Sequence, residues 1–137
     1  MSRATVLAIF ALVALSVIAT AAPQGADLSN VQIKTTKITP NFYTLEGQGG
    51  TIGALVGPDG VFVVDSQFAP LTEKLAAAIR GISTTPIRFL INTHYHWDHV
   101  GGNENMAKAG VLIVAHDNVY KRMNGRQVVH ILKQDIP

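Results

Sequence analysis

Hydrophobic and polar positions divide the chain into an apolar N-terminal stretch and a longer region of short apolar runs. In that longer region, six runs have the length and the β-branched or aromatic content of β-strands. They lie at residues 31–35, 42–45, 51–56, 61–65, 87–91 and 111–114. The third and fourth runs are apolar at almost every position, and the fifth ends shortly before a group of histidines.

Other segments predict turns and helices between these strands. Gly57-Pro58-Asp59-Gly60 has turn chemistry and predicts a β-hairpin that brings Asp65 to one end of the sheet. Apolar residues recur at helical spacing in residues 70–82, which predicts an amphipathic helix that covers the sheet. A helix of about two turns after Gly102 and another from residue 117 to 123 complete an α/β pattern.

The densest group of reactive side chains directly follows a predicted strand. Residues 94–99 read His-Tyr-His-Trp-Asp-His, which is unusual in a chain with five histidines. In an extended segment, residues two apart face the same way, so His94 and His96 can converge on one cation. Asp98 continues that alternation and His99 faces the other side, which indicates two metal ions. Imidazole and carboxylate donors favour zinc, and a hydrogen-bonded loop without metal is the alternative.

His94-x-His96-x-Asp98-His99 after an apolar strand resembles the signature of the metallo-β-lactamase superfamily. The resemblance extends to the apolar run that ends in Asp65. It also includes Gly101-Gly102-Asn103, which is similar to the family's glycine-rich helix start. The resemblance implies an α/β fold, the N-terminal half of an αββα sandwich, in residues 31–137.

The resemblance also implies a role for each matching residue. The equivalents of His94 and His96 bind the first metal with a third histidine. The equivalents of Asp98 and His99 bind the second metal with another distant histidine, and a downstream carboxylate bridges the ions. The Asp65 equivalent supports these ligands from outside the coordination sphere. Two zinc ions are therefore the expected cofactor, and Asp98 is the expected catalytic residue, orienting a zinc-bound hydroxide.

The downstream ligands of the family are not visible in this sequence, so we expect a domain truncated at its C-terminus, Pro137. Two histidines follow the motif. His116 comes after an apolar strand and is either a metal ligand at the rim or a helix-start residue beside Asp117. We interpret His130 as an ordinary residue.

The aromatic and glycine residues near the motif have separate interpretations. Tyr95 and Trp97 alternate with the imidazoles, so we expect them to pack beneath the loop, with substrate contact as the alternative. Residues 47–51 are rich in glycine but lack a following Lys-Ser/Thr and precede a strand. They therefore predict a flexible turn, which in a family member could shape substrate entry.

The N-terminus predicts export. Arg3 precedes an apolar run, and Ala19-Thr20-Ala21 supplies small residues for cleavage, so we expect a signal peptide at 1–21 and a linker at 22–30. A membrane anchor is the alternative, but the run is short for a bilayer. Cleavage would leave 116 of the 137 residues and lower the formal charge from +2 to +1. We expect a secreted or periplasmic protein with no stable membrane anchor.

Composition and family together narrow the function. The charge is too small, and basic runs too few, to indicate nucleic acid, and the absence of cysteine excludes disulfides and thiolate ligands. We expect a small-molecule substrate; the oligomeric state stays open. The favoured function is a zinc-dependent hydrolase of an amide or ester-type bond, plausibly a β-lactam. A glyoxalase-II-like thioesterase or other general hydrolase, a non-catalytic metal-binding fragment, and a metal-free structural module are the alternatives.

Overall fold

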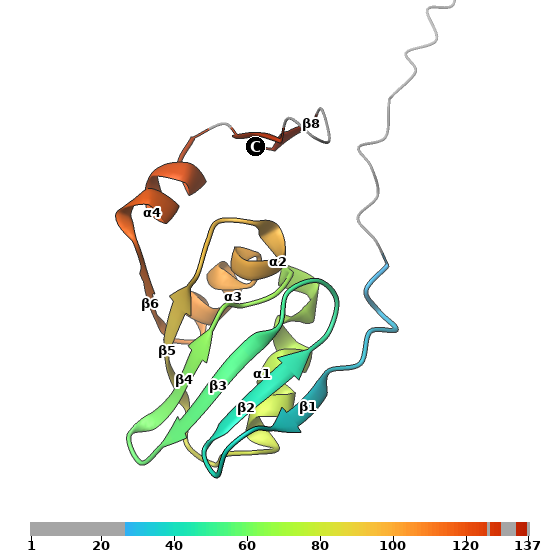
Figure 1. The fold of residues 1–137 in the computed structure, drawn as a ribbon, viewed down its shortest axis with the longest axis vertical. Coiled ribbons are helices and arrows are strands. Elements are labelled where there is room, and N and C mark those ends of the chain that lie inside the picture. The colour runs from blue at the N-terminus through green and yellow to red at the C-terminus, as the bar shows by residue number, and fades with distance from the viewer. Residues whose placement is uncertain (1–26, 126, 130–133, 137) are drawn as a thin grey trace, which may run out of the picture.

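The computed structural model describes residues 27–125, 127–129 and 134–136, and side chains up to residue 125 (Figure 1). The predicted signal peptide and His130 lie outside the described residues. Six strands form one sheet in chain order: β1 (Lys34–Lys37), β2 (Phe42–Glu46), β3 (Ile52–Gly57), β4 (Gly60–Val64), β5 (Ile87–Asn92) and β6 (Leu112–Ala115). Strands β1 to β4 are antiparallel to their neighbours, whereas β4, β5 and β6 run parallel.

Short helices connect the parallel strands. The 3-10 turn η1 (Ala69–Leu71) and helix α1 (Thr72–Arg80) lie between β4 and β5, and helices α2 (Trp97–Val100) and α3 (Asn103–Lys108) lie between β5 and β6. Helix α4 (Asp117–Met123) follows β6. The strands β7 (Gln127–Val129) and β8 (Gln134–Ile136) form a separate antiparallel pair. In the described part of the chain, no helix combines the length and hydropathy that a membrane span requires.

The hydrophobic core lies between one face of the sheet and the helices. It contains Leu45, Ile52, Ala54, Val61, Val63 and Leu90 from the strands, Leu75 and Ile79 from α1, Met106 from α3, and Val111. Figure 1 shows α1 behind the sheet. The predicted amphipathic helix therefore covers the sheet as expected, and burial of its apolar stripe accounts for its position.

The opposite face of the sheet is also apolar, but no other described element covers it. We call it the outer face. The strand register places on it Phe42, Leu55, Phe62, Val64, Phe89, Ile91, Leu112 and Val114. Leu112 is 59% exposed, and the Phe62 and Phe89 rings lie 6.0 Å apart, centroid to centroid. The apolar residues of β4 and β5 that face the helices are buried in the core, whereas those on the outer face pack against no other described element.

The first strand does not lie where the sequence predicts it. The predicted run at 31–35 becomes β1 at Lys34–Lys37, because the backbone before it has another partner. The Lys74 ammonium on α1 donates to the carbonyl oxygens of Leu28 and Val31 at 3.2 and 2.7 Å, and also to that of Ser29. These carbonyl groups are therefore satisfied by a side chain instead of a neighbouring strand.

The remaining elements follow the sequence more closely. The hairpin of β3 and β4 is confirmed, with Gly57 paired to Gly60, and α4 has the predicted bounds. The helix predicted at 70–82 is split into η1 and α1 and ends at Arg80, where the Gly81 amide donates back to the Ala77 carbonyl. Because β4, β5 and β6 are parallel, the segments after them meet at one edge of the sheet, where α/β folds place ligands.

Candidate metal centre

The His-rich motif forms a loop and a short helix at this edge. The sequence-based prediction of an extended segment is wrong beyond His96, because α2 begins at Trp97 and contains Asp98 and His99. The helical turn brings the His99 ring next to the His94 ring, with centroids 3.9 Å apart, so strand-like alternation does not set its direction. The four predicted ligands therefore lie together in the structure.

The donor atoms of the motif form two pairs. His94 Nε2 lies 3.1 Å from His96 Nδ1, and His99 Nε2 lies 3.4 Å from Asp98 Oδ2. Two ligand atoms bound to the same tetrahedral zinc ion at ordinary bond lengths would be roughly 3.3 Å apart. Both pairs match that spacing, and imidazole nitrogen with carboxylate oxygen is a donor set that suits zinc. Each pair therefore has the spacing of two ligands on one metal ion, and the chemistry of the donors suits a metal such as zinc.

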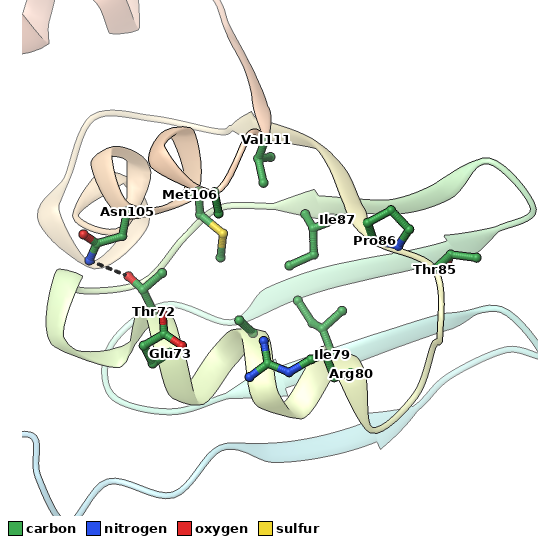
Figure 2. A pocket seen from close by; sticks show the side chains of 12 residues that line it. Thr72, Glu73, Ile79, Arg80, Thr85, Pro86, Ile87, Asn105, Met106 and Val111 are labelled. Carbon is green, nitrogen blue, oxygen red and sulfur yellow. Dashed lines mark hydrogen bonds between the residues drawn. The ribbon is translucent and has the colours of Figure 1, made fainter.

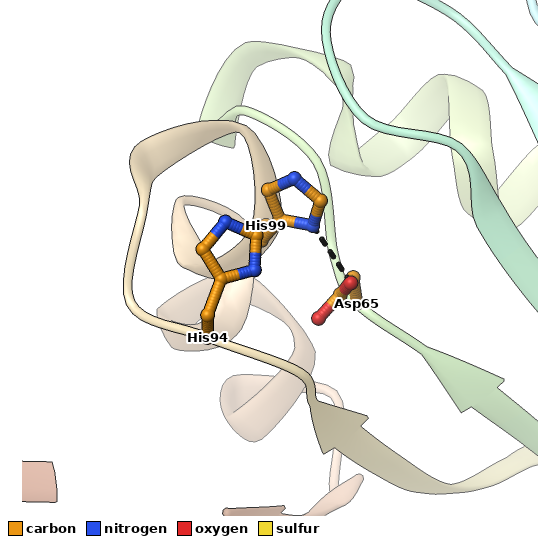
Figure 3. Close-up of side chains that lie close together, drawn as sticks. All are labelled: Asp65, His94 and His99. Atoms are coloured by element: carbon orange, nitrogen blue, oxygen red, sulfur yellow. Dashed lines mark hydrogen bonds and ion pairs between the residues drawn. The ribbon is translucent and has the colours of Figure 1, made fainter. Parts of the chain in front are cut away.

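Asp65 connects two of these imidazoles (Figure 3). Its Oδ2 lies 2.7 Å from His99 Nδ1 and accepts from the Thr93 hydroxyl at 2.7 Å, while its Oδ1 accepts from the Thr93 amide at 2.8 Å. Since Thr93 Oγ1 donates its proton to Asp65, it accepts from His94 Nδ1, which is 3.0 Å away. Both imidazoles thus carry Nδ1–H and present Nε2 as an acceptor, which a hydrogen-bond donor such as His96 Nδ1 or a metal ion can use.

Asp65, His94 and His99 also form a second possible metal-binding group, because each offers one ligand atom within 4.8 Å of the others. However, both Asp65 oxygens already accept hydrogen bonds from Thr93 or His99. The carboxylate is also buried, with 3% of its side chain exposed. A buried carboxylate with three donors is satisfied without an ion, so its geometry favours orientation of the imidazoles over metal binding.

The electrostatics of His94 also suit a ligand. Burial lowers its pKa below the ordinary value of 6.5, and repulsion from His99 and His96 lowers it further, against the opposing attraction of Asp65 and Asp98. A lowered pKa favours the neutral imidazole, which is the form that binds metal.

Two polar side chains, those of Ser66 and Asn92, bind the backbone carbonyl of His99, and Asn103 binds both of them. The sequence-based prediction missed their role. The His99 carbonyl accepts from the Ser66 amide at 2.8 Å, from Ser66 Oγ at 3.1 Å and from Asn92 Nδ2 at 3.2 Å. Asn92 and Asn103 exchange a reciprocal pair of hydrogen bonds at 3.1 and 2.7 Å. Polar residues directly after apolar strands were the available signal, since that is where this edge forms.

The glycine-rich segment, residues 47–51, packs directly on the Asp98–His99 pair. A Cβ atom at Gly50 would overlap His99 Cε1, and one at Gly49 would lie 2.6 Å from Asp98 Cβ. Gly49 also has a φ of +86°, in the left-handed region that favours glycine. The glycines therefore allow close contact with the motif, which a flexible turn alone would not require.

Trp97 does not pack beneath the loop as predicted, because its side chain is 49% exposed. It lines an apolar hollow of about 450 Å³ together with Leu28, Gln48, Phe68, Ala69, Pro70 and Gly101. Gly49, next to Gln48, contacts both Phe68 and Asp98, so the hollow borders the metal centre. Tyr95 instead has the Arg122 guanidinium 5.8 Å from its ring centroid.

Another hollow, of about 280 Å³, lies between α1, α3 and the segment before β5 (Figure 2). Apolar side chains such as Ile79, Met106 and Val111 form much of its lining, and no histidine or aspartate lines it. His116 is not part of the metal centre either: its Nδ1 accepts from the Asn118 amide at 3.1 Å, so it caps the start of α4. The helix-start interpretation of His116 agrees with this geometry.

Comparison with known proteins places this arrangement in a family. The sequence model of the metallo-beta-lactamase superfamily matches residues 46–135, which include the motif, Asp65 and the glycine-rich segment. The chain belongs to this superfamily. Its six-stranded mixed sheet with short helices is a partial domain of the superfamily's α/β fold, as the sequence predicts.

Solved metallo-β-lactamases share the fold. FIM-1 from Pseudomonas aeruginosa, in its mono-zinc form, superposes with a TM-score of 0.62 at 19% identity, over 68% of this chain and 46% of that one. The Cronobacter sakazakii metallo-β-lactamase with a HARLDQ motif has a TM-score of 0.61 and 20% identity, over 67% of this chain and 37% of that one. The Hirschia baltica metallo-β-lactamase has a TM-score of 0.58 and 22% identity, over 67% of this chain and 47% of that one. The chain thus spans less than half the length of these proteins.

Proposed function

We propose that this chain is the zinc-binding portion of a metallo-β-lactamase-superfamily hydrolase. The pairing of donor atoms supports the proposal. His94 and His96 would hold one ion, and Asp98 and His99, whose donor atoms lie 3.4 Å apart, would hold the other. Family membership supports hydrolysis, and the mono-zinc form of the FIM-1 relative supports zinc.

The residues of the chain have distinct tasks in this proposal. Bound zinc supplies Lewis acidity, which brings the pKa of water toward neutrality and polarises the bond to be cleaved. Asp65 keeps the Nε2 atoms of His94 and His99 available through their Nδ1 hydrogen bonds. Asp98 is the catalytic residue that accepts a proton from the attacking water and passes it to the leaving group. No serine or cysteine nucleophile is required.

We propose an amide or ester-type bond in a small molecule as the substrate, and a β-lactam as the first candidate, because solved relatives are metallo-β-lactamases. The N-terminal export signal that the sequence predicts supports a periplasmic or secreted location, where such antibiotics act. A thioester is the second candidate. Comparing turnover of a chromogenic cephalosporin with that of a thioester separates the two.

A non-catalytic metal-binding segment is the competing proposal. The exposed outer face favours it, as does the 37–47% share of the related structures that the chain spans. Such a segment would bind zinc weakly and below two ions per chain, because each pair supplies two donors, fewer than the three or four protein ligands of ordinary zinc sites.

The deciding experiment is zinc per chain, measured by elemental mass spectrometry on protein purified without chelator. About two ions per chain support the hydrolase site, whereas a small fraction of one ion supports the non-catalytic segment. His96→Ala should abolish zinc retention, and hydrolysis in the complete protein, because it removes a ligand. His116→Ala changes an exposed histidine outside the metal centre and should retain zinc. Full zinc binding by His96→Ala would contradict the assignment.

A further inference from the structure

Gln67 is a buried polar residue that the proposed chemistry does not use. Its side chain is fully buried, and its φ of 60° lies in the left-handed region, which is rare for residues other than glycine. Its side-chain Nε2 donates to the main-chain carbonyl of Gly50. Its main-chain carbonyl accepts from the Gly102 amide at 2.9 Å. Gln67 thus connects the glycine-rich segment to the start of α3.

Packing alone does not explain a glutamine at this position. Among the described residues, Gln67 Oε1 is the buried side-chain polar atom that has no hydrogen-bond partner. A buried amide with half its capacity unsatisfied is less favourable than a methionine of similar shape. A residue that is unfavourable for stability and has a strained backbone is expected where function requires it.

The hydrogen bond to Gly50 has a direct consequence for the metal centre. Gly50 lies against the His99 ring and Gly49 against Asp98, so the carbonyl that Gln67 binds belongs to the segment in contact with the second donor pair. The motif atoms nearest to a Cβ at these two glycines belong to Asp98 and His99. The connection therefore acts most directly on this pair of ligands.

We infer that Gln67 is a positioning residue that holds the glycine-rich segment on the Asp98–His99 pair and thereby slows exchange of solvent and metal at that pair. The effect on metal rests on the proposed function. The hydrogen bond that holds the segment does not, and it can be tested in metal-free protein.

Gln67→Met tests the inference, because it keeps the shape of the side chain and removes both the donor and the unpartnered oxygen. Amide hydrogen exchange of Ile52, which pairs with Leu45 where the glycine-rich segment enters β3, should become about tenfold faster in metal-free protein, the factor expected for one hydrogen bond of ordinary net strength. The midpoint of urea unfolding should change little. Gln48→Met makes the same chemical change on an exposed side chain of this segment and should leave exchange unchanged.

Gln67→Leu provides a second variant, since its side chain also has no donor for the Gly50 carbonyl, and it should accelerate exchange of the same amide. Unchanged exchange at Ile52, or equal acceleration throughout the chain, would overturn the inference. In zinc-loaded protein, Gln67→Met should release one of two ions to excess chelator about tenfold faster. Equal release of both ions would overturn the effect on metal. If the protein binds no zinc but Gln67→Met still exchanges faster, the proposed function is contradicted and the positioning role of Gln67 is retained.

Discussion

At the scale of single residues, Asp65 organises the candidate metal centre although it is not one of the motif residues. Its two oxygens accept from the amide and hydroxyl of Thr93 and from His99 Nδ1. Directly for His99, and through Thr93 for His94, it therefore determines which ring nitrogen carries the proton. Asp65 itself has a φ of 66°, and this left-handed backbone turns the chain sharply after β4. Such a conformation persists only where neighbouring contacts hold it.

Asp65→Asn should lower zinc affinity by about 10- to 100-fold, because the amide cannot accept from His99 and Thr93 as a carboxylate does. Competition with a chromophoric chelator measures the affinity. Asp59→Asn is the matched control, since Asp59 is exposed in the turn between β3 and β4, and it should retain the wild-type affinity. Wild-type affinity in Asp65→Asn would show that His99 does not depend on this carboxylate.

The lowered pKa of His94 predicts a pH dependence of folding. Burial and the neighbouring imidazoles favour neutral His94 in the folded state, so below pH 6.5 the unfolded chain takes up a proton before the folded protein does. The free energy of unfolding of metal-free protein should therefore fall as the pH drops from 6.5 towards the lowered pKa. Urea unfolding at about pH 7.5 and 5.5 measures the change. His94→Gln should lose less stability on acidification than wild type or His116→Gln; equal losses would contradict the prediction.

At the scale of elements, the parallel order of β4, β5 and β6 builds the site. The segments that follow these strands emerge at one edge, which brings Asp65 beside Thr93 and the motif although they are far apart in the sequence. The helix α2 then turns Asp98 and His99 toward the loop that carries His94. The position of the N-terminal segment depends in the same way on a neighbour, Lys74 of α1.

Lys74→Met should lower the free energy of unfolding by about 1–3 kcal/mol, because an ammonium that donates to three backbone carbonyls is lost. Urea unfolding measures the stability, and faster amide exchange near residues 28–33 should accompany the loss. Lys108→Met is the control: its ion pair with Glu104 is exposed on α3, so its removal should leave the free energy of unfolding nearly unchanged. Equal effects of the two variants would show that the carbonyl contacts do not stabilise the segment.

At the scale of the whole molecule, the described sheet has one covered face and one outer face. Eight apolar residues lie on the outer face, whereas charged residues occur on it only at the edge, where Lys34 pairs with Glu46 at 3.3 Å. A contiguous apolar surface of this kind is typical of an interface. In a chain that spans less than half of its related structures, the outer face is where further protein would pack.

The purified 137-residue chain should therefore bind a hydrophobic dye and self-associate. Leu112→Lys should reduce dye binding and self-association, because it places a charge in the outer face. Dye fluorescence measures the binding, and sedimentation velocity measures the association. Ile38→Lys is the matched control, since Ile38 is similarly exposed, at 55% against 59% for Leu112, but lies in the turn after β1. A monomeric wild-type chain that binds no dye would mean that the outer face is covered.

The sequence by itself predicted the candidate donor residues and determined most of the strands. His94, His96, Asp98 and His99 are adjacent in the chain, and the turn at residues 57–60 predicts its hairpin, because both signals are local. The tertiary structure alone decided the contacts of Ser66, Gln67, Asn92 and Asn103, the start of β1 and the exposure of Trp97. Each depends on partners distant in sequence, such as Lys74 for the N-terminal segment and Gly50 for Gln67. A local sequence pattern does not indicate which distant carbonyl group a side chain will contact. These contacts therefore become visible only when the elements are packed together in the tertiary structure.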